Sequence, residues 1–90
     1  MQIKWQEDTV NDLVALRQYI ALDNSEAAQR IAGKILECAS LLKEHPFLGK
    51  AGRIHSTREF VVSSTPFTIV YLPQAESITI LRIFHQMQQW

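Results

Sequence analysis

The sequence predicts an α+β fold, in which an N-terminal strand precedes an antiparallel pair of helices and then a three-stranded antiparallel meander. Apolar residues recur at helical spacing through the first half of the chain and form short β-rich runs after residue 57. A polar break divides the first half into two helices, and short turn segments divide the second half into strands. Because the helices are consecutive, we expect them on one face of a four-stranded sheet, with the other face comparatively open.

The first strand and the first helix are predicted at the N-terminal end. Ile3 and Trp5 alternate with polar neighbours, which is typical of a short strand with one buried face. Thr9 is a candidate helix N-cap, with Asp12 three residues later in a weakened form of the capping box. We expect this helix to run to about Leu22, because apolar residues follow at helical spacing: Val10, Leu13, Val14, Leu16 and Ile20.

The second helix has the clearest periodicity in the chain. Residues 23–25 break the first helix and offer Asn24 as the next N-cap. The helix must end by His45, because Pro46 disfavours helical geometry in the residue before it. So short a link between the helices favours an antiparallel hairpin. The apolar stripe consists of Ala28, Ile31, Ala32, Ile35, Ala39 and Leu42.

The rest of the chain changes to strand patterns after one loop. Residues 47–56 contain Gly49 and Gly52 without any periodicity, so we predict an irregular basic loop. Turn segments at 63–66 and 73–77 then separate three runs rich in β-branched and aromatic residues. Short connections make these strands an antiparallel meander, at residues 57–62, 67–72 and 78–85.

Length and composition predict one domain, residues 1–90, since a chain of 90 residues has room for a single core. Hydrophobic residues make up 47% and charged residues 20%, an ordinary globular balance. The single cysteine, Cys38, lies in a helical pattern and is interpreted as a packing residue in a reducing compartment. The chain has no apolar run long enough to span a bilayer and no secretory signal pattern, so we expect a cytoplasmic location and no membrane partner.

Charge is balanced overall but unevenly distributed. A net charge of zero argues against a protein that holds nucleic acid mainly by neutralising phosphates. Residues 1–26 hold two basic and five acidic side chains, a net −3, which leaves +3 for the remainder. Much of this excess lies between residues 43 and 58, where an acidic partner can dock; a solvated loop with ordinary surface charges is the alternative. In that segment only Glu44 opposes Lys43, Lys50, Arg53 and Arg58.

Neither a metal site nor a cofactor is predicted. His45, His55 and His85 are scattered, and no cluster of His, Cys, Asp and Glu has the spacing of metal ligands. Gly49 and Gly52 are too few for a nucleotide loop and follow a helix, whereas a phosphate-binding loop follows a strand and begins a helix.

Four stretches carry a resemblance to a known family, and the likeness covers essentially the whole chain. They are IKW at residues 3–5, YIALDNSEAA at 19–28, HPFLGKAGR at 45–53 and LRIFHQ at 81–86. In these stretches the sequence resembles the RelE/ParE superfamily of bacterial toxins from type II toxin–antitoxin systems. The resemblance implies a fold of one strand, two helices and three strands.

Within that superfamily the chain is more similar to the ParE branch, through the proline-glycine loop followed by Thr57-Arg58-Glu59 and the ending of an arginine, two apolar residues and a histidine. This resemblance implies a toxin that inhibits DNA gyrase by binding and is neutralised by a cognate antitoxin, with larger toxin–antitoxin assemblies also implied. RelE-like members instead cut messenger RNA on the ribosome. An inactive relative that only binds its antitoxin is the third hypothesis.

The ribonuclease hypothesis names Arg58, Arg82 and His85 as catalytic residues. Metal-independent RNA cleavage needs a base, an acid and cations that stabilise the developing phosphate charge. Arginine suits bidentate contact with phosphate, and an imidazole can act as acid or base near neutral pH. Arg82 and His85 have opposite strand parity, so a regular last strand places them on opposite faces of the sheet. Only a bulge or a strand end at Phe84 would reunite them.

Structural roles are the alternative for the same residues. Arg82 can pair with Glu59 or another carboxylate, and His85 can be a hydrogen-bonded residue at the end of a strand. Partner binding is assigned to Lys50, Arg53 and Arg58 and to Trp90, which either anchors a partner or seals an edge of the core.

Overall fold

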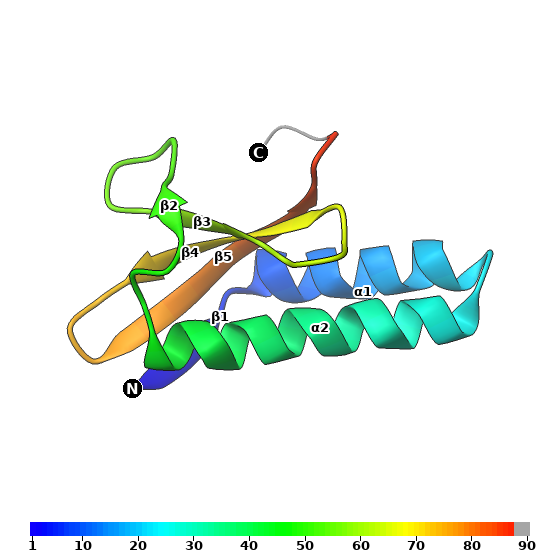
Figure 1. Ribbon diagram of the computed structural model, residues 1–90, viewed down its shortest axis with the longest axis horizontal. Helices are drawn as coiled ribbons and strands as arrows, with labels where there is room; N and C mark the ends of the chain where they lie inside the picture. The colour runs from blue at the N-terminus through cyan, green and yellow to red at the C-terminus, as the bar shows by residue number, and fades with distance from the viewer. Residues whose placement is uncertain (88–90) are drawn as a thin grey trace.

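The computed structural model describes residues 1–87 and confirms the α+β class, with two helices packed on one face of a sheet (Figure 1). The sheet has five strands, one more than expected. The elements in chain order are β1 (Gln2–Trp5), α1 (Glu7–Ala21), α2 (Ser25–Glu44), β2 (Lys50–Ala51), β3 (Arg58–Val61), β4 (Phe67–Pro73) and β5 (Ser77–His85).

The additional strand, β2, lies inside the segment predicted to be an irregular loop. Its two residues pair antiparallel with β3, Lys50 with Glu59 and Ala51 with Arg58. That part of the prediction was wrong because two residues are too few to show a periodic pattern, and the pairing exists only where the loop passes alongside β3.

Strand order in the sheet is β1-β5-β4-β3-β2, so the N-terminal strand lies next to the C-terminal one. The pairing of β1 with β5 is parallel, from Gln2 opposite Ser77 to Trp5 opposite Ile80. The remaining pairs are antiparallel, as a meander with short turns requires. The two helices supply the long crossover that parallel pairing of β1 needs, and they therefore cover one face of β5 and its neighbours.

A bulge in β5 changes which residues face the helices. Val70 pairs with Arg82 while Tyr71 pairs with Ile80, so Leu81 has no partner in β4. Side chains of a regular strand alternate, and one extra residue shifts the alternation. Ile83 consequently joins Ile80 in the core, although the two residues are an odd number apart.

The two helices begin in different ways. Asn24 is the N-cap of α2 as predicted, and its side chain accepts a hydrogen bond from the backbone N–H of Ala27 at 3.0 Å. The prediction for Thr9 was wrong, because α1 begins at Glu7 and its N-cap is Gln6, three residues before Thr9; the Gln6 side chain makes no capping bond. Thr9 instead lies wholly buried in the first turn, where its hydroxyl donates to the carbonyl oxygen of Ile80 at 2.7 Å.

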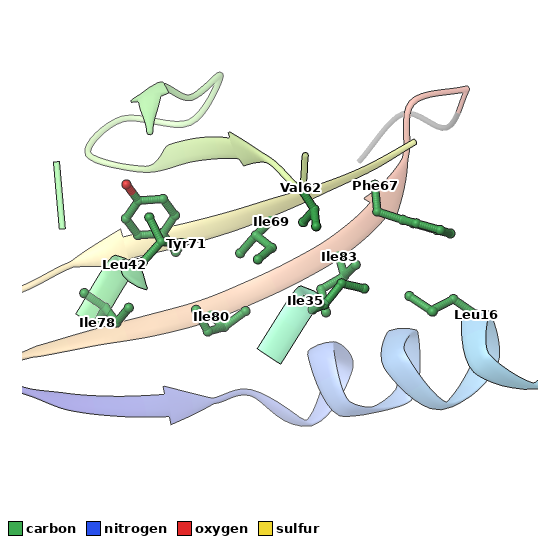
Figure 2. Packing of buried hydrophobic residues seen from close by; sticks show 10 residues of the cluster. All are labelled: Leu16, Ile35, Leu42, Val62, Phe67, Ile69, Tyr71, Ile78, Ile80 and Ile83. Atoms are coloured by element: carbon green, nitrogen blue, oxygen red, sulfur yellow. The ribbon is translucent and has the colours of Figure 1, made fainter. Parts of the chain in front are cut away.

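The core lies between the helices and the sheet (Figure 2). Ile35 and Leu42 of α2 are completely buried against β4 and β5, and Leu16 contributes from α1. Their helical spacing places these residues on the inner face of the hairpin. The strands supply Phe67, Ile69, Tyr71, Ile78, Ile80 and Ile83, and Val62 follows β3.

The opposite face of the sheet is less open than expected. Alternate residues of β4 point away from the helices, and of these Val70 is 0% exposed and Thr68 only 7%. Val70 stands between Glu59 and Arg82 in one row across three strands. Long charged side chains cover apolar surface with their stems, so a row of this composition leaves little of the valine exposed.

No helix in the described residues 1–87 is long and apolar enough to cross a membrane.

Candidate functional site

The basic loop, defined as residues 46–57 between α2 and β3, carries the exposed cationic side chains that the sequence analysis assigned to partner binding. Lys50 and Arg53 are exposed, and so is His55. Two of the loop residues form β2, so the loop is tied to the sheet at its middle. Its shape therefore depends on what holds the segments on either side of that strand.

The first segment of the loop is held by Tyr71 of β4. This side chain is 0% exposed, and its hydroxyl accepts a hydrogen bond from the Gly49 backbone N–H at 2.8 Å. The same hydroxyl donates to the carbonyl oxygen of Pro46, also at 2.8 Å. Burial raises the pKa of Tyr71, while the Gly49 hydrogen bond and the charge of Arg58 act in the opposite direction. The neutral hydroxyl is therefore the form that fastens the loop.

Gly49 is required for this close approach. A Cβ atom at residue 49 would lie 2.7 Å from the Tyr71 hydroxyl oxygen and 2.9 Å from the Glu59 carbonyl oxygen. Gly49 is buried although it lies in a loop. Any side chain at this position would push the loop away from both β3 and β4.

Arg58, at the start of β3, holds the same segment from the other side. Its Nη1 donates to the carbonyl oxygen of Gly49 at 2.6 Å and to that of Phe47 at 3.2 Å. The guanidinium also lies 4.8 Å from the centre of the Phe47 ring, a cation–π distance. Arg58 therefore contacts the protein's own loop backbone through Nη1 rather than presenting that group to a partner.

The second segment of the loop closes on itself. Gly52 donates its backbone N–H to the Thr57 carbonyl oxygen at 2.8 Å, and the Thr57 hydroxyl donates to the Ile54 carbonyl oxygen at 2.5 Å. The backbone N–H of Arg53 donates to Glu59 Oε2 at 3.3 Å. Ser56 adopts a left-handed conformation with φ of 69°, which allows the chain to turn back toward β3.

A shallow groove of about 640 Å³ runs between this loop and the end of β4. Phe47, which is 69% exposed, and Ile54, which is 56% exposed, give it apolar surface, and Arg53 and His55 also line it. Within residues 1–87, no aspartate or glutamate contributes to its lining. Such a surface suits a partner that combines negative charge with an apolar side chain.

Arg82 forms an ion pair within the protein. Its Nε donates to Asp12 Oδ2 at 2.7 Å and its Nη2 donates to Asp12 Oδ1 at 3.0 Å. The hydrogen bond with Asp12 raises the pKa of Arg82, and the charges of Asp12 and Asp8 add to this effect. A carboxylate partner for Arg82, either Glu59 or another residue, was the alternative to a catalytic role, and that partner is Asp12 of α1.

His85 is partly buried at the end of β5. Its ring meets the Phe67 ring edge-on, with centroids 5.5 Å apart and planes at 89°. Its Nδ1 accepts a hydrogen bond from the Met87 backbone N–H at 3.0 Å. These contacts agree with the hydrogen-bonded strand-end role considered for this residue.

The structure does not bring Arg58, Arg82 and His85 together. Arg82 and His85 point to opposite faces, because their register with β4 is continuous and no bulge falls between them. Arg58 is paired with Tyr71 and His85 with Phe67, four residues apart on β4, which corresponds to about 13 Å. A general acid or base and the phosphate-binding arginines must all reach the same phosphodiester group, each within hydrogen-bonding range of the oxygen on which it acts. The observed arrangement does not provide that convergence.

Two further points of the sequence analysis concern Trp90 and metal ligands. Trp90, assigned to partner binding, lies outside the described residues. Over residues 1–87, His, Cys, Asp and Glu form no group of three that could hold a metal ion.

Sequence reasoning missed Tyr71, Gly49 and Asp12 as site residues. A tyrosine in an otherwise apolar strand is a weak signal, since a buried phenol hydroxyl usually has a hydrogen-bond partner. Nothing in the local pattern indicated that this partner is Gly49, 22 residues earlier. Asp12 was interpreted as part of a helix cap, whereas its carboxylate reaches β5.

Comparisons with known proteins agree with this architecture. The family described as "ParE toxin of type II toxin-antitoxin system, parDE" matches residues 3–90. The chain is 35% identical over 89 residues to "Putative toxin Y4kP" of Sinorhizobium fredii, with 99% of this chain and 92% of that protein covered. It is 34% identical over 84 residues to "Toxin RelE2" of Caulobacter vibrioides, with 93% of each protein covered.

A solved structure titled "Chromosomal ParDE TA system from P. aeruginosa" superimposes with a TM-score of 0.82 at 25% identity, over 94% of this chain and 95% of that one. The family match and both relatives extend over nearly the entire sequence, so they include the helical hairpin, the basic loop and the meander together. This chain belongs to the ParE toxin family of type II toxin–antitoxin systems, within the RelE/ParE superfamily.

Proposed function

We propose that this member of the ParE family stops growth by binding DNA gyrase, without chemistry of its own, and that a cognate antitoxin neutralises it. Membership of the family supports the general role of a toxin with an antitoxin partner. The choice of gyrase over the ribosome is supported by the positions and hydrogen bonds of the residues that RNA cleavage would need.

The observation that carries this choice is the ion pair between Arg82 and Asp12. Both Nε and Nη2 of Arg82 are engaged by one carboxylate, so phosphate would have to compete with a bidentate internal partner. His85 points to the other face of the sheet, and Arg58 Nη1 is bound to loop carbonyls. Binding needs no such convergence of an acid, a base and a cation.

Gyrase contact is proposed for the basic loop, through Lys50 and Arg53, with Trp90 as a further anchor. Both loop side chains are exposed, and the adjacent groove offers apolar surface beside their charge. Burial of a few aromatic or aliphatic anchors supplies most of the affinity of protein interfaces, while surrounding charges favour the correct partner. Arg58 acts on the same surface by supporting it.

Neutralisation is proposed to occur when a segment of the antitoxin folds onto the toxin and covers or competes for this surface. Short segments that order on binding can wrap a large area and extend a sheet edge or lie along helices. We also propose that residues 1–90 act as one domain in the cytoplasm, where gyrase and the antitoxin are both present.

Two reactions test the proposed target. Purified toxin is added to a gyrase supercoiling reaction and, separately, to a translating extract probed for cut messenger RNA. We expect supercoiling to stop and the messenger RNA to stay intact. A Lys50→Glu, Arg53→Glu double variant should lose inhibition, whereas the matched Lys4→Glu, Arg30→Glu variant, changed at exposed sites outside the loop, should keep it. Loss of inhibition in both variants would reject the loop as the contact surface.

A ribosome-dependent ribonuclease is the second candidate, because one relative carries the name Toxin RelE2. Cleavage of messenger RNA by the wild-type protein, abolished in an Arg82→Ala, His85→Ala variant that still folds, would establish it. Growth arrest unchanged in that double variant would remove it. A protein that binds its antitoxin but affects neither reaction would be an inactive relative.

A further inference from the structure

We infer that Tyr71 and Arg58 are positioning residues, which hold the basic loop in the shape that its macromolecular partner binds. The inference rests on the proposed function for the identity of that partner, gyrase. It concerns residues to which the family assignment gives no role, and it reinterprets Arg58 as a support for the binding surface rather than a contact.

The two side chains fasten one short stretch of backbone from two sides. Tyr71 binds the Pro46 carbonyl oxygen and the Gly49 N–H, and Arg58 binds the carbonyl oxygens of Phe47 and Gly49. All four hydrogen bonds therefore end on the backbone between residues 46 and 49. Lys50, the first residue of β2, follows this stretch directly, so the position at which the cationic segment joins the sheet is set here.

Both side chains come from paired strands of the sheet. Tyr71 belongs to the core cluster, and Figure 2 shows its ring among the buried residues with the hydroxyl oxygen at the outer edge of the cluster. Arg58 stands directly opposite Tyr71 in the pairing of β3 with β4. One row of the sheet thus carries both supports, and Gly49 is the residue small enough to reach them.

An ordered loop binds more tightly than a mobile one. A partner that captures a mobile loop must first order its backbone, and that entropic cost subtracts from the binding free energy. The four hydrogen bonds order the loop backbone when the protein folds, so the partner does not have to order it on binding. Loss of the supports should therefore weaken inhibition while every cationic side chain remains in place.

Tyr71→Phe removes only the hydroxyl and keeps the ring in the core. We expect this variant to need about tenfold more protein for half-maximal gyrase inhibition. A tenfold change in affinity corresponds to about 1.4 kcal/mol, which is about the net contribution of one or two hydrogen bonds. Native-state trypsin should also cut faster after Lys50 and Arg53, the lysine and the arginine inside the loop. Tyr19→Phe, at a tyrosine of α1 that is 74% exposed, should match the wild type in both measurements.

Arg58→Lys separates positioning from charge. Lysine keeps the positive charge but cannot reproduce the planar donors and ring contact of the guanidinium. We expect Arg58→Lys to show faster loop cleavage and weaker inhibition, as Tyr71→Phe does. The double variant should lose less than the product of the two single effects, because both act through the same stretch of backbone.

Ile69→Val distinguishes a loop effect from a general loss of stability. Ile69 is 0% exposed in the core, so this change lowers global stability without touching the loop. It should leave inhibition and the rate of loop cleavage unchanged at a temperature where it and Tyr71→Phe are both folded. Equal losses in the two variants would overturn the inference.

Failure of the inference and failure of the proposed function give different results. Wild-type protein that leaves gyrase active rejects gyrase as the target, and the protease measurement still decides whether the loop is held. Loop cleavage at the wild-type rate in Tyr71→Phe overturns the inference whether or not gyrase is inhibited. Faster cleavage with full inhibition overturns it as well, because the partner then does not need the ordered loop.

Discussion

Asp12 Oδ2 accepts hydrogen bonds from both the Nε of Arg82, at 2.7 Å, and the backbone N–H of Ile83, at 3.0 Å. The parallel pairing of β1 with β5 stops at Ile80. Beyond Ile80, the edge of β5 that faces away from β4 therefore has no neighbouring strand. The carboxylate from α1 takes the place of a strand there and joins the helix to the sheet. Arg82 accordingly serves to orient the carboxylate that accepts the hydrogen bond from the Ile83 backbone N–H.

Asp12→Ala should destabilise the protein more than Arg82→Ala. Asp12 has 16% of its side chain exposed and supplies three hydrogen bonds, so its loss should cost about 2 kcal/mol. Arg82 has 43% of its side chain exposed, and without it the carboxylate still accepts from Ile83 and gains water, for a cost of about 0.5–1 kcal/mol. Urea unfolding measures both free energies. A reversed order would contradict the edge role of Asp12.

Two glycine substitutions should shift stability in opposite directions. Gly49→Ala places a Cβ 2.8 Å from the Tyr71 ring and 2.9 Å from the Glu59 carbonyl oxygen, and such overpacking should cost about 2 kcal/mol. Gly33 lies within α2, and a Cβ there meets nothing within 4 Å, so Gly33→Ala should stabilise by about 0.5–1 kcal/mol. Thermal unfolding of the two variants checks this; a stabilising Gly49→Ala would show that the loop is not held as described.

Thr9→Val should cost about 1 kcal/mol in the free energy of unfolding. The change keeps the shape of the side chain but removes the buried hydroxyl that donates to the Ile80 carbonyl oxygen. That oxygen still accepts from the Gln6 backbone N–H at 3.2 Å, which limits the loss. Thr79→Val is the control, because its hydroxyl bond to Gln74 is exposed and water can replace it, for a change within about 0.5 kcal/mol. Equal costs for the two variants would contradict the importance of the buried bond.

Tyr71 should make stability decline at high pH. Burial raises its folded-state pKa above the ordinary 10.0, so the unfolded chain releases the phenol proton at a lower pH than the folded protein does. The stability from neutral Tyr71 is complete below about pH 10 and falls as the pH rises from there through the folded-state pKa. Urea unfolding between pH 7 and 11 should show a steeper decline for the wild type and Tyr19→Phe than for Tyr71→Phe. Parallel declines in all three would refute this assignment.

The last strand, β5, is an element whose side-chain directions the local sequence pattern predicts only in part. Ile78, Ile80, Ile83 and His85 do not fit one regular alternation, and the sequence analysis treated the strand as regular. The bulge at Leu81 shifts the alternation between Ile80 and Ile83. Arg82 and His85 nevertheless lie on opposite faces, which is the outcome expected for a strand that is regular between them, because the bulge precedes both residues.

The sequence by itself determined the order of the elements apart from β2, the cap at Asn24 and the end of α2 before Pro46. Periodicity, capping and the geometry of proline act over a few residues, so a single segment contains all the information they need. The basic character of the loop was visible in the same way.

Only the tertiary structure decided which distant residues meet: β1 beside β5, Asp12 with Arg82, and Tyr71 with Gly49. These contacts depend on where packing of the helices against the sheet brings segments separated by 22 to 75 residues. The local sequence pattern does not predict these contacts. The same residue type in the same pattern can point to solvent in one fold and contact a distant partner in another. The contacts of Arg58 and Arg82 therefore became visible only once the core had placed their partners.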